Sequence, residues 1–241
     1  MTSDLAVRIT LVHSPLVGPI TWSAVASQLR RGGDQVVVPD LRAAVTARPP
    51  YQPAVWNAVA EAIDEMPDDD SLVLVGHSGA GPLLPAIAGA CGQPVQALIY
   101  VDAGLPRPGR SWFERAPSDL AEHVRELETN GVLPPWDEWF EPDSLAALLP
   151  DETTRVRFRR ELPKLRLAFL AERSPPVPWA GANGFLLLSE SYRPDAEEAR
   201  AAGWPVLEHV SHHLAMLTEP ALIADVLRKL CRLLLPDAGQ S

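Results

Sequence analysis

The sequence predicts an α/β fold, a three-layer α/β/α sandwich in which a mostly parallel sheet of six strands lies between two layers of helices. Three observations predict it. Apolar runs of four to six residues without polar alternation recur along the chain, which is typical of strands buried on both faces. Stretches with helical periodicity separate these runs, and such alternation produces parallel sheets covered by helices. With 241 residues, of which 46% are hydrophobic, the chain is long enough to bury one large core.

The first four predicted strands alternate with three predicted helices. The strands are expected at 7–12, 35–38, 72–76 and 96–101, and the helices at 21–30, 51–66 and 79–90. The first helix stops at Gly32 and Gly33, because glycine readily ends a helix. In the third helix Pro82 fits the first turn, whereas Pro85 removes an internal hydrogen bond. We therefore expect that helix to start irregularly.

The alternation stops between residues 104 and 181 and then returns. This segment holds 11 of the 25 prolines and four of the seven tryptophans, with helices expected at 119–130 and 152–162. After it, strands are expected at 185–188 and 206–210 and helices at 196–202 and 220–234. We predict a core formed by residues 1–103 and 182–241, with a helical, Pro/Trp-rich cap (lid) insertion at 104–181. Because ligands bind outside the carboxyl ends of parallel strands, we expect the cap to roof the ligand site.

Charge and composition exclude several classes of partner. The chain has 21 Lys+Arg against 31 Asp+Glu, a net charge of −10, which argues against nucleic acid or anionic lipid as the main partner. No apolar run approaches the roughly 20 residues of a membrane span. Arg8 and His13 interrupt the first apolar stretch, which therefore does not resemble a signal peptide. The two cysteines, Cys91 and Cys231, lie in apolar helical patterns and are expected to be free thiols. We expect a cytoplasmic protein with a small-molecule substrate, and the sequence predicts no oligomeric state.

The strongest local motif is Gly76-His77-Ser78-Gly79-Ala80, which differs from the G-x-S-x-G pattern in its last residue, with Gly81 one position further on. It follows a predicted buried strand and precedes a predicted helix of small residues. A serine at such a sharp turn is held out above the sheet, where its hydroxyl can act as a nucleophile. Small flanking residues let the backbone approach closely, and the helix N-terminus favours developing negative charge. We predict that Ser78 is a catalytic nucleophile.

Motifs along essentially the whole chain resemble the α/β-hydrolase superfamily. They are Leu11-Val12-His13 followed by Gly18-Pro19 and Trp22, the strand end Pro39-Asp40-Leu41, the turn Gly76-His77-Ser78, the segment Val101-Asp102-Ala103, and the ending from His213 to Pro220. The compact six-stranded form is similar to the branch of plant esterases and hydroxynitrile lyases. This resemblance implies an α/β-hydrolase fold, a serine-based catalytic triad and no cofactor.

The resemblance also implies a general base. The family places its histidine seven residues before the proline that opens the last helix, and counting back from Pro220 gives His213, with His212 as the alternative. A neutral imidazole there takes the proton of the serine and returns it to the leaving group. His209, His212 and His213 also have an H-x-x-H-H spacing. Three nitrogens on a strand end and a loop would not point at one ion, so we expect no metal site.

Two positions are open for the acid that orients the histidine. The family's usual place follows the strand at 185–188, where this sequence offers Glu190 without a clear G-x-x-D match. The other place used in the family is the end of the preceding strand, where Asp102 stands. A carboxylate at the edge of the core needs partners to stay ionised. We expect Asp102, with Glu190 second, and a purely structural Asp102 at the start of the insertion is a further interpretation.

The expected oxyanion hole departs from the family. One donor is expected to be the amide of Gly79, directly after the nucleophile. The residue that corresponds to the second donor is Pro15, which has no N–H. One lost donor costs on the order of 3 kcal/mol of transition-state stabilisation in other enzymes. Either Leu16 or the hydroxyl of Ser14 replaces it, or the reaction needs no full oxyanion hole. His77, beside the nucleophile, is expected to pack or to form a hydrogen bond near the substrate.

Three functions remain open. The first is a serine hydrolase of the carboxylester hydrolase class that cleaves a small to medium apolar ester, lactone or thioester through an acyl-enzyme intermediate. Pro15 favours the second, a non-hydrolytic lyase or cyclase of secondary metabolism. The third is a non-catalytic protein of the same fold that binds a small molecule, against which an intact Ser78 and His213 argue.

Overall fold

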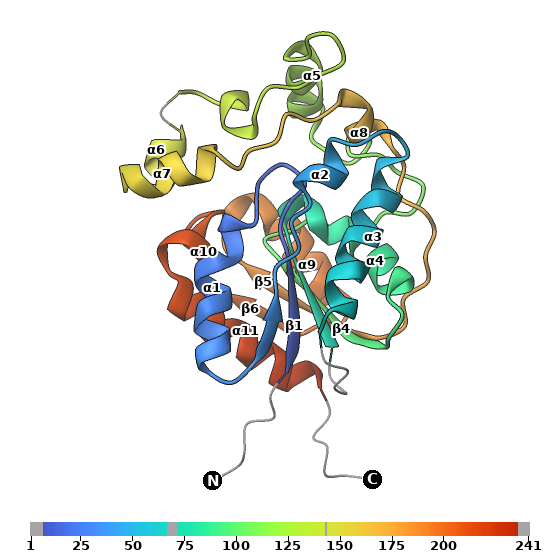
Figure 1. The fold of residues 1–241 in the computed structure, drawn as a ribbon, viewed down its shortest axis with the longest axis vertical. Coiled ribbons are helices and arrows are strands. Elements are labelled where there is room, and N and C mark those ends of the chain that lie inside the picture. The colour runs from blue at the N-terminus through green and yellow to red at the C-terminus, as the bar shows by residue number, and fades with distance from the viewer. Residues whose placement is uncertain (1–6, 67–71, 143, 236–241) are drawn as a thin grey trace.

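The chain folds around a parallel sheet of six strands in the order β2-β1-β3-β4-β5-β6 (Figure 1). This computed structural model describes residues 7–66, 72–142 and 144–235. The strands are β1 (Arg8–Val12), β2 (Gln35–Val37), β3 (Leu72–His77), β4 (Val95–Val101), β5 (Ala182–Leu187) and β6 (Val206–Glu208). Every pairing between neighbouring strands is parallel. The predicted fold class is confirmed.

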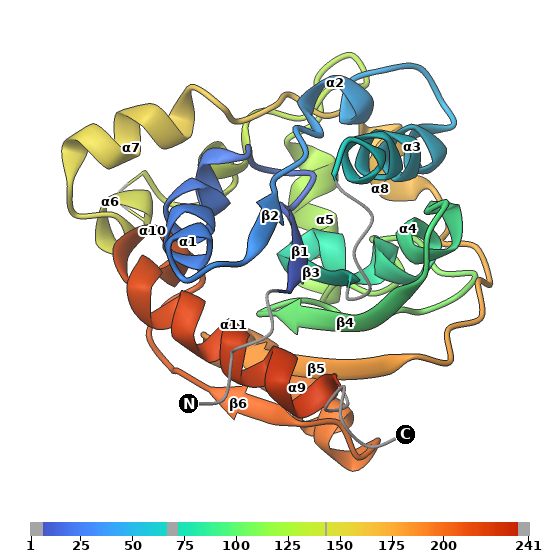
Figure 2. The same cartoon turned by 60° about the horizontal axis from the view of Figure 1, so that its bottom comes forward.

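Helices cover both faces of the sheet (Figure 2). On one face lie α1 (Ile20–Arg31), α10 (Ala215–Thr218) and α11 (Pro220–Leu234), whose apolar residues share one buried cluster with the sheet. On the other face lie α2 (Arg42–Val45), α3 (Tyr51–Asp64), α4 (Leu84–Ala90) and α9 (Arg193–Ala201), which share a second cluster. The sheet is therefore the middle layer of an α/β/α sandwich.

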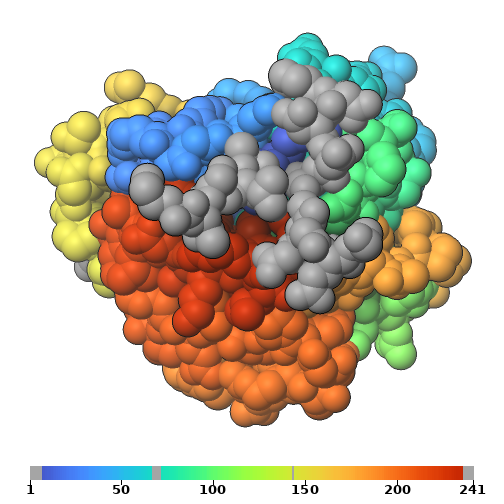
Figure 3. All heavy atoms as spheres, turned by 90° about the horizontal axis from the view of Figure 1, so that it is seen from below, coloured from blue at the N-terminus to red at the C-terminus, as the bar shows by residue number. Residues whose placement is uncertain are grey.

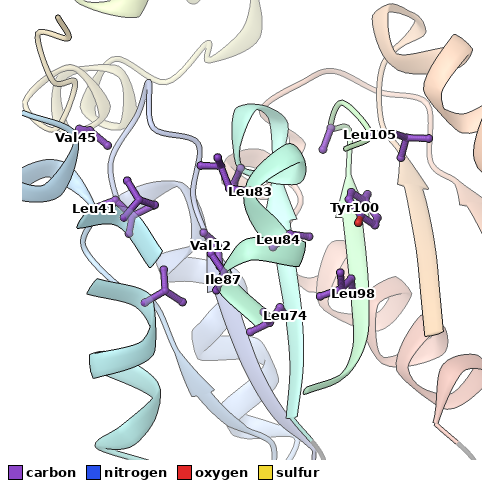
Figure 4. Close-up of a cluster of buried hydrophobic side chains, with 14 of the residues drawn as sticks. Val12, Leu41, Val45, Leu74, Leu83, Leu84, Ile87, Leu98, Tyr100 and Leu105 are labelled. Carbon is purple, nitrogen blue, oxygen red and sulfur yellow. The ribbon is translucent and has the colours of Figure 1, made fainter. Parts of the chain in front are cut away.

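Side chains of the strands alternate between these two helical layers. In β3, Leu74 belongs to the cluster beneath α3 and α4, whereas Val73 and Val75 belong to the cluster beneath α1 and α11. Figure 4 shows the first of these clusters, with Leu74 and Leu98 of the sheet and Ile87 of α4 among its members. Because both faces of the strands are covered, both sets of side chains are apolar. This explains why the strand sequences show no polar alternation.

The helix expected at 79–90 differs from the others in how it starts. It is divided into a 3₁₀ helix, η1 (Ser78–Leu83), followed by α4. Pro82 lies inside η1, and Pro85 is the second residue of α4. Neither proline has an N–H to donate to a preceding carbonyl, so a regular α-helix cannot begin at Gly79. The expected irregular start is confirmed.

Residues 104–181, called the insertion below, leave the sheet after β4 and return to it at β5 (Figure 1). They contain α5 (Ser118–Glu126), η2 (Trp136–Trp139), α6 (Ser144–Leu148), α7 (Glu152–Arg159) and α8 (Leu167–Ala171). Glu161 accepts a hydrogen bond of 2.7 Å from the amide of Ile20, at the start of α1. Glu172 accepts from the amides of Tyr51 and Gln52, at 2.7 and 2.9 Å, at the start of α3. Negative charge is favourable at helix N-termini, so these contacts fasten the insertion to both helical layers.

At the end of the molecule opposite the insertion, α1 and α11 adjoin each other (Figure 3). Arg228 of α11 links them. Its Nη2 donates to the carbonyl oxygens of Gln28 and Leu29, at 3.0 and 2.7 Å, where α1 ends. Its Nε donates to Asp34 at 2.9 Å. A cation that satisfies the last carbonyls of a helix stabilises that end of the helix.

The two cysteines are free, as expected. Burial raises the pKa of the Cys91 thiol to about 11 and that of Cys231 to about 12. Both thiols therefore stay protonated at neutral pH and are poor nucleophiles. Within the three described ranges of the chain, no helix combines the length and the apolar character needed to cross a membrane.

Candidate active site

Ser78 lies at the sharp turn where β3 ends and η1 begins. Its φ is +55°, in the left-handed region that costs a residue with a side chain about 1–2 kcal/mol. The turn lifts the residue off the end of the strand, and 7% of its surface is exposed. The sequence predicted this strand–turn–helix context for Ser78. A backbone kept in such a conformation is typical of a residue that must present its side chain at one fixed point.

Close backbone contacts around this turn explain its small residues. A Cβ at Gly76 would lie 2.9 Å from a methyl group of Leu84. A Cβ at Gly81 would lie 2.5 Å from the carbonyl oxygen of Gly104. Ala80, by contrast, is fully buried in the core without such a conflict. The close approach therefore falls on Gly81, one position after the glycine of the G-x-S-x-G pattern, and this accounts for the shifted register.

Asp102 and His213 form a hydrogen-bonded pair near Ser78. Asp102 follows β4 with a φ of +43° and is completely buried. Its Oδ2 lies 2.7 Å from Nδ1 of His213, and it also accepts from the Ser189 hydroxyl at 2.6 Å. Its Oδ1 accepts from the amides of Leu188 and Ser189, both at 2.8 Å. Four donors compensate the burial of a carboxylate. This pair fixes Nδ1 of His213 as the protonated nitrogen and leaves Nε2 free to accept a proton.

Glu190, the alternative acid, does not reach His213. Its side chain is 65% exposed and forms an ion pair with Arg193, with Nε and Oε2 2.5 Å apart. The hydrogen bonds to Arg193 lower the pKa of Glu190. Glu190 belongs to η3 (Glu190–Tyr192), which directs its carboxylate to the helix that follows. The structure thus brings Asp102, and not Glu190, to the histidine.

Tyr192 is a further site residue, which no sequence motif indicated. Its hydroxyl lies 3.2 Å from Oγ of Ser78, and its ring stacks on the ring of His213 with centroids 5.2 Å apart and planes 10° apart. Burial raises its pKa to about 12, so the hydroxyl is protonated at neutral pH. The signal for it was an aromatic residue five positions after the end of the fifth strand, at the edge of the sheet where the other site residues lie.

Two buried histidines hold the loops of the site through hydrogen bonds. Nε2 of His77 lies 3.0 Å from the carbonyl oxygen of His213, and burial lowers the pKa of His77 well below its usual value. A carbonyl oxygen only accepts, so His77 donates and positions the loop of His213. His13 bonds to Ser14 O through Nδ1 at 2.8 Å, and its Nε2 accepts from the amide of Leu41 at 3.1 Å. Burial lowers the pKa of His13 to about 4. Both rings are neutral at pH 7.

The loop after β1 lies beside Gly79. A Cβ at Gly79 would be 3.1 Å from Oγ of Ser14 and 3.5 Å from Cδ of Pro15. The amide of Leu16 donates to Oγ of Ser14 at 3.3 Å, a long bond that nonetheless directs this amide at the hydroxyl. Since the oxygen of Ser14 accepts from Leu16, its own proton is available for another acceptor. Of the two replacements expected for the missing amide of Pro15, the structure therefore favours Ser14 over Leu16.

The remaining histidines of the loop after β6 (Val206–Glu208) diverge from one another. Nε2 of His209 pairs with Glu219 at 2.8 Å, and Nε2 of His212 bonds to the hydroxyl of Thr218 at 2.9 Å. His213 turns toward Asp102. In the parts of the chain that the structure describes, no group of three or more His, Cys, Asp or Glu side chains is arranged to hold a metal ion.

A pocket opens beside Gly79, between the loop after β1 and the insertion. Pro15, Leu16 and Gly79 form its floor, and Trp112, Phe169 and Leu170 of the insertion form its apolar wall. The hollow measures about 400 Å³ only when space open to solvent is included, and the part that a water-sized sphere can occupy is about 30 Å³, far below the roughly 300–1,000 Å³ of small-molecule sites. The pocket is a small, partly open hollow next to Gly79, the residue that follows Ser78.

The family model described as the alpha/beta hydrolase family matches residues 11–226, a range that includes Ser78, Asp102 and His213. None of the curated proteins has a sequence that matches this chain.

Solved structures share the fold over almost the whole chain. The extracellular α/β-hydrolase from a Paenibacillus species, described as structurally and functionally homologous to tobacco salicylic acid binding protein 2, superposes with a TM-score of 0.73 at 17% identity, covering 93% of this chain and 98% of that one. Polyneuridine aldehyde esterase superposes with a TM-score of 0.70 at 17% identity, covering 93% of this chain and 99% of that one. A pyrethroid hydrolase from Sphingobium faniae JZ-2 superposes with a TM-score of 0.70 at 16% identity, covering 94% of this chain and 98% of that one. At these identities the likeness is one of fold.

Proposed function

The chain belongs to the alpha/beta hydrolase family, and we propose that it is a serine hydrolase that cleaves a small to medium ester, lactone or thioester through an acyl-enzyme intermediate. The observation that carries this proposal is the hydrogen bond between Asp102 and Nδ1 of His213, beside a serine at a strained strand–helix turn. An esterase and a pyrethroid hydrolase among proteins of the same fold are consistent with this class of reaction.

The chemistry begins with Ser78. Its Oγ attacks the carbonyl carbon of the substrate while Nε2 of His213 takes the hydroxyl proton. Asp102 keeps the proton of His213 on Nδ1 and stabilises the imidazolium that forms. In the resting structure Oγ is hydrogen-bonded to Tyr192, so it must rotate about the Cα–Cβ bond toward His213 before it attacks.

The negative charge that develops on the carbonyl oxygen needs donors. We assign the amide of Gly79 as the first and the hydroxyl of Ser14, which lies beside it, as the second. His213 then returns its proton to the leaving alcohol or thiol. A water molecule, activated by the same histidine, cleaves the acyl-enzyme and regenerates Ser78. Over both halves of the cycle the protons balance without a cofactor.

A series of p-nitrophenyl esters with increasing acyl length tests this function. A rapid burst of one p-nitrophenol per chain, followed by slower turnover, is expected if an acyl-enzyme accumulates. Ser78→Ala should abolish the burst and the turnover. Turnover that survives in Ser78→Ala would contradict the proposal. The small pocket predicts that kcat/KM declines beyond short acyl chains.

Pro15 and Tyr192 favour a second candidate, a non-hydrolytic lyase or cyclase reaction. A proline in place of a donor weakens an oxyanion hole, and a protonated hydroxyl 3.2 Å from Ser78 can supply a proton to a reaction that does not pass through an acyl-enzyme. Pro15→Gly separates the two candidates. If Ser14 completes the oxyanion hole, ester hydrolysis changes less than about threefold. A rise of about 100-fold, the effect of one restored donor, supports the second candidate.

The third possibility is a protein of this fold that binds a small molecule without turning it over. It predicts saturable binding and no acylation of Ser78. A burst with any ester of the series excludes it.

A further inference from the structure

The pocket beside Gly79 contains one cation that the proposed chemistry does not use. Arg115 of the insertion lines this pocket together with the apolar side chains of Trp112 and Phe169. It is partly buried, and desolvation lowers its pKa. An arginine remains charged at neutral pH even so. A charge on the wall of a mainly apolar pocket is costly unless something compensates it.

Local contacts hold Arg115 in place without neutralising it. The amides of Arg115 and Ala116 both donate to the carbonyl oxygen of Trp112, at 3.0 and 2.9 Å, and this turn fixes the backbone of Arg115. Its Nε donates to the carbonyl oxygen of Ser111 at 3.2 Å. Within residues 7–66, 72–142 and 144–235, this is the one hydrogen bond that the guanidinium group makes. Both Nη nitrogens, four of its five N–H donors, are left for a ligand.

The carboxylates nearby are committed elsewhere. Among the acids, Asp195 raises the pKa of Arg115 most. Its Oδ1 accepts a hydrogen bond from the amide of Leu105 at 3.0 Å, and it forms no ion pair with the guanidinium group within 4.0 Å. Glu172, also on the pocket wall, uses both oxygens to accept from the amides at the start of α3. Neither Asp195 nor Glu172 forms an ion pair with Arg115 in the resting protein.

Arg115 also lies near the reacting groups. Its Nη1 would be 3.5 Å from a Cβ on Gly104, the residue whose carbonyl oxygen approaches Gly81 of η1. Its charge lowers the pKa of Tyr192, against the larger effect of burial, and the hydroxyl of Tyr192 contacts Ser78. An anion bound to Arg115 would therefore be within a short chain length of the carbonyl carbon that Ser78 attacks.

We propose that Arg115 binds a carboxylate on the acyl part of the substrate, so that the preferred substrates are monoesters or monothioesters of short dicarboxylic acids. The inference rests on the proposed function for the position of the scissile bond. The apolar wall of Trp112, Phe169 and Leu170 contacts the methylene groups, and the guanidinium binds the terminal carboxylate. The bond that breaks is the ester bond, and the carboxylate takes no part in the proton transfers.

Matched esters test the proposal by turnover. Monomethyl succinate, glutarate and adipate are compared with the corresponding monoamides, in which an uncharged carboxamide replaces the carboxylate. The wild type should prefer the charged ester of at least one length by roughly 10- to 100-fold in kcat/KM, the effect of one charge-assisted interaction. Arg115→Met should reduce this preference at least tenfold, and Arg115→Lys should keep part of it. Arg110→Met is the matched control, since Arg110 is an exposed cation of the same segment, and the preference should be unchanged.

Binding to Ser78→Ala separates this proposal from the proposed function. Calorimetric titration of that variant with monomethyl adipate and with its monoamide needs no catalysis. If Ser78→Ala binds monomethyl adipate at least tenfold more tightly than its monoamide, and the double variant with Arg115→Met no longer does, the carboxylate site is supported. This result does not depend on whether the wild type turns over either ester. Equal binding of anion and amide to Ser78→Ala with Arg115 intact would overturn the carboxylate site, whatever the esterase activity. This comparison also holds if Arg115→Met fails to fold.

Discussion

Replacing Asp102 with asparagine removes the charge that holds His213 while the shape of the side chain is kept. Oδ1 accepts from the amides of Leu188 and Ser189, both at 2.8 Å, so the oxygen of the asparagine must stay on this side. Its NH₂ group then faces Nδ1 of His213, which lies 2.7 Å from Oδ2 in the native chain. Nδ1 must accept, the proton moves to Nε2, and the imidazole can no longer take the proton of Ser78.

The expected loss follows from this change of tautomer. The same change lowers kcat by about 10⁴-fold in a serine protease, which corresponds to about 5 kcal/mol of transition-state stabilisation. We expect kcat/KM of Asp102→Asn on a p-nitrophenyl ester to fall by about 10³- to 10⁴-fold. Thermal unfolding should shift by only a few degrees, because the two backbone hydrogen bonds remain.

The matched control is Glu190→Gln, which makes the same chemical change at the other candidate acid. Glu190 is exposed and paired with Arg193, so kcat/KM should change less than twofold. A loss below about tenfold in Asp102→Asn, or a comparable loss in Glu190→Gln, would refute the assignment of Asp102 as the orienting acid.

Three further predictions concern the nucleophile, the pH dependence of stability and the turn. Tyr192→Phe removes the hydroxyl that is hydrogen-bonded to Oγ of Ser78 in the resting protein. Because loss of a competing hydrogen bond of about 1 kcal/mol frees the nucleophile, we expect the burst of acylation, measured by stopped flow, to be roughly fivefold faster. A slower burst would mean that the phenol assists the reaction. The pKa of His13 falls from 6.5 to about 4 on folding, so the unfolded chain binds a proton that the folded chain does not, and His13 by itself should lower the free energy of unfolding by about 3 kcal/mol between pH 7 and pH 4. Urea unfolding should show a smaller loss in His13→Asn, and an equal loss would contradict this. Gly81→Ala places a Cβ 2.5 Å from the carbonyl oxygen of Gly104 and should lower the free energy of unfolding by about 2–3 kcal/mol. In the control Gly92→Ala the new Cβ lies 3.8 Å from the nearest atom, so the free energy of unfolding should change by less than about 0.5 kcal/mol. Equal denaturation midpoints for the two variants would contradict the predicted steric clash at Gly81.

The sheet could be predicted from sequence because its strands are buried on both faces. Val73, Leu74 and Val75 are apolar whichever helical layer they face, so the run is continuous and easy to recognise. β5 was harder. It begins at Ala182, three residues before the predicted start, since pairing with Ala97 of β4 extends a strand through residues of low β-propensity.

The insertion was less predictable because tertiary contacts set its path. Leu133 donates to the carbonyl oxygen of Leu165 at 2.8 Å, and Glu172 reaches helix α3, 120 residues earlier in the chain. Proline-rich segments without periodicity carry no signal for such contacts. The short helices α6 and α8 have five residues each and were not expected.

Within the site, the sequence indicated Ser78 and His213 through motif and spacing but left the acid open between two carboxylates. The backbone amides that compensate Asp102 belong to Leu188 and Ser189, directly after β5 and 86 and 87 residues later in the chain, and pairing of β4 with β5 brings them together. Tyr192 was missed for the same reason, since its contact with Ser78 spans 114 residues. Residues joined only by the fold leave no local pattern.

Labelling with a fluorophosphonate shows directly whether Ser78 is a nucleophile that His213 activates. The reagent phosphonylates activated serines, and peptide mapping by mass spectrometry locates the adduct. We expect one adduct per chain on the peptide that contains Ser78, none in Ser78→Ala, and labelling slowed by at least 10³-fold in His213→Ala. An unlabelled wild-type chain, or an adduct on any other residue, would contradict this expectation.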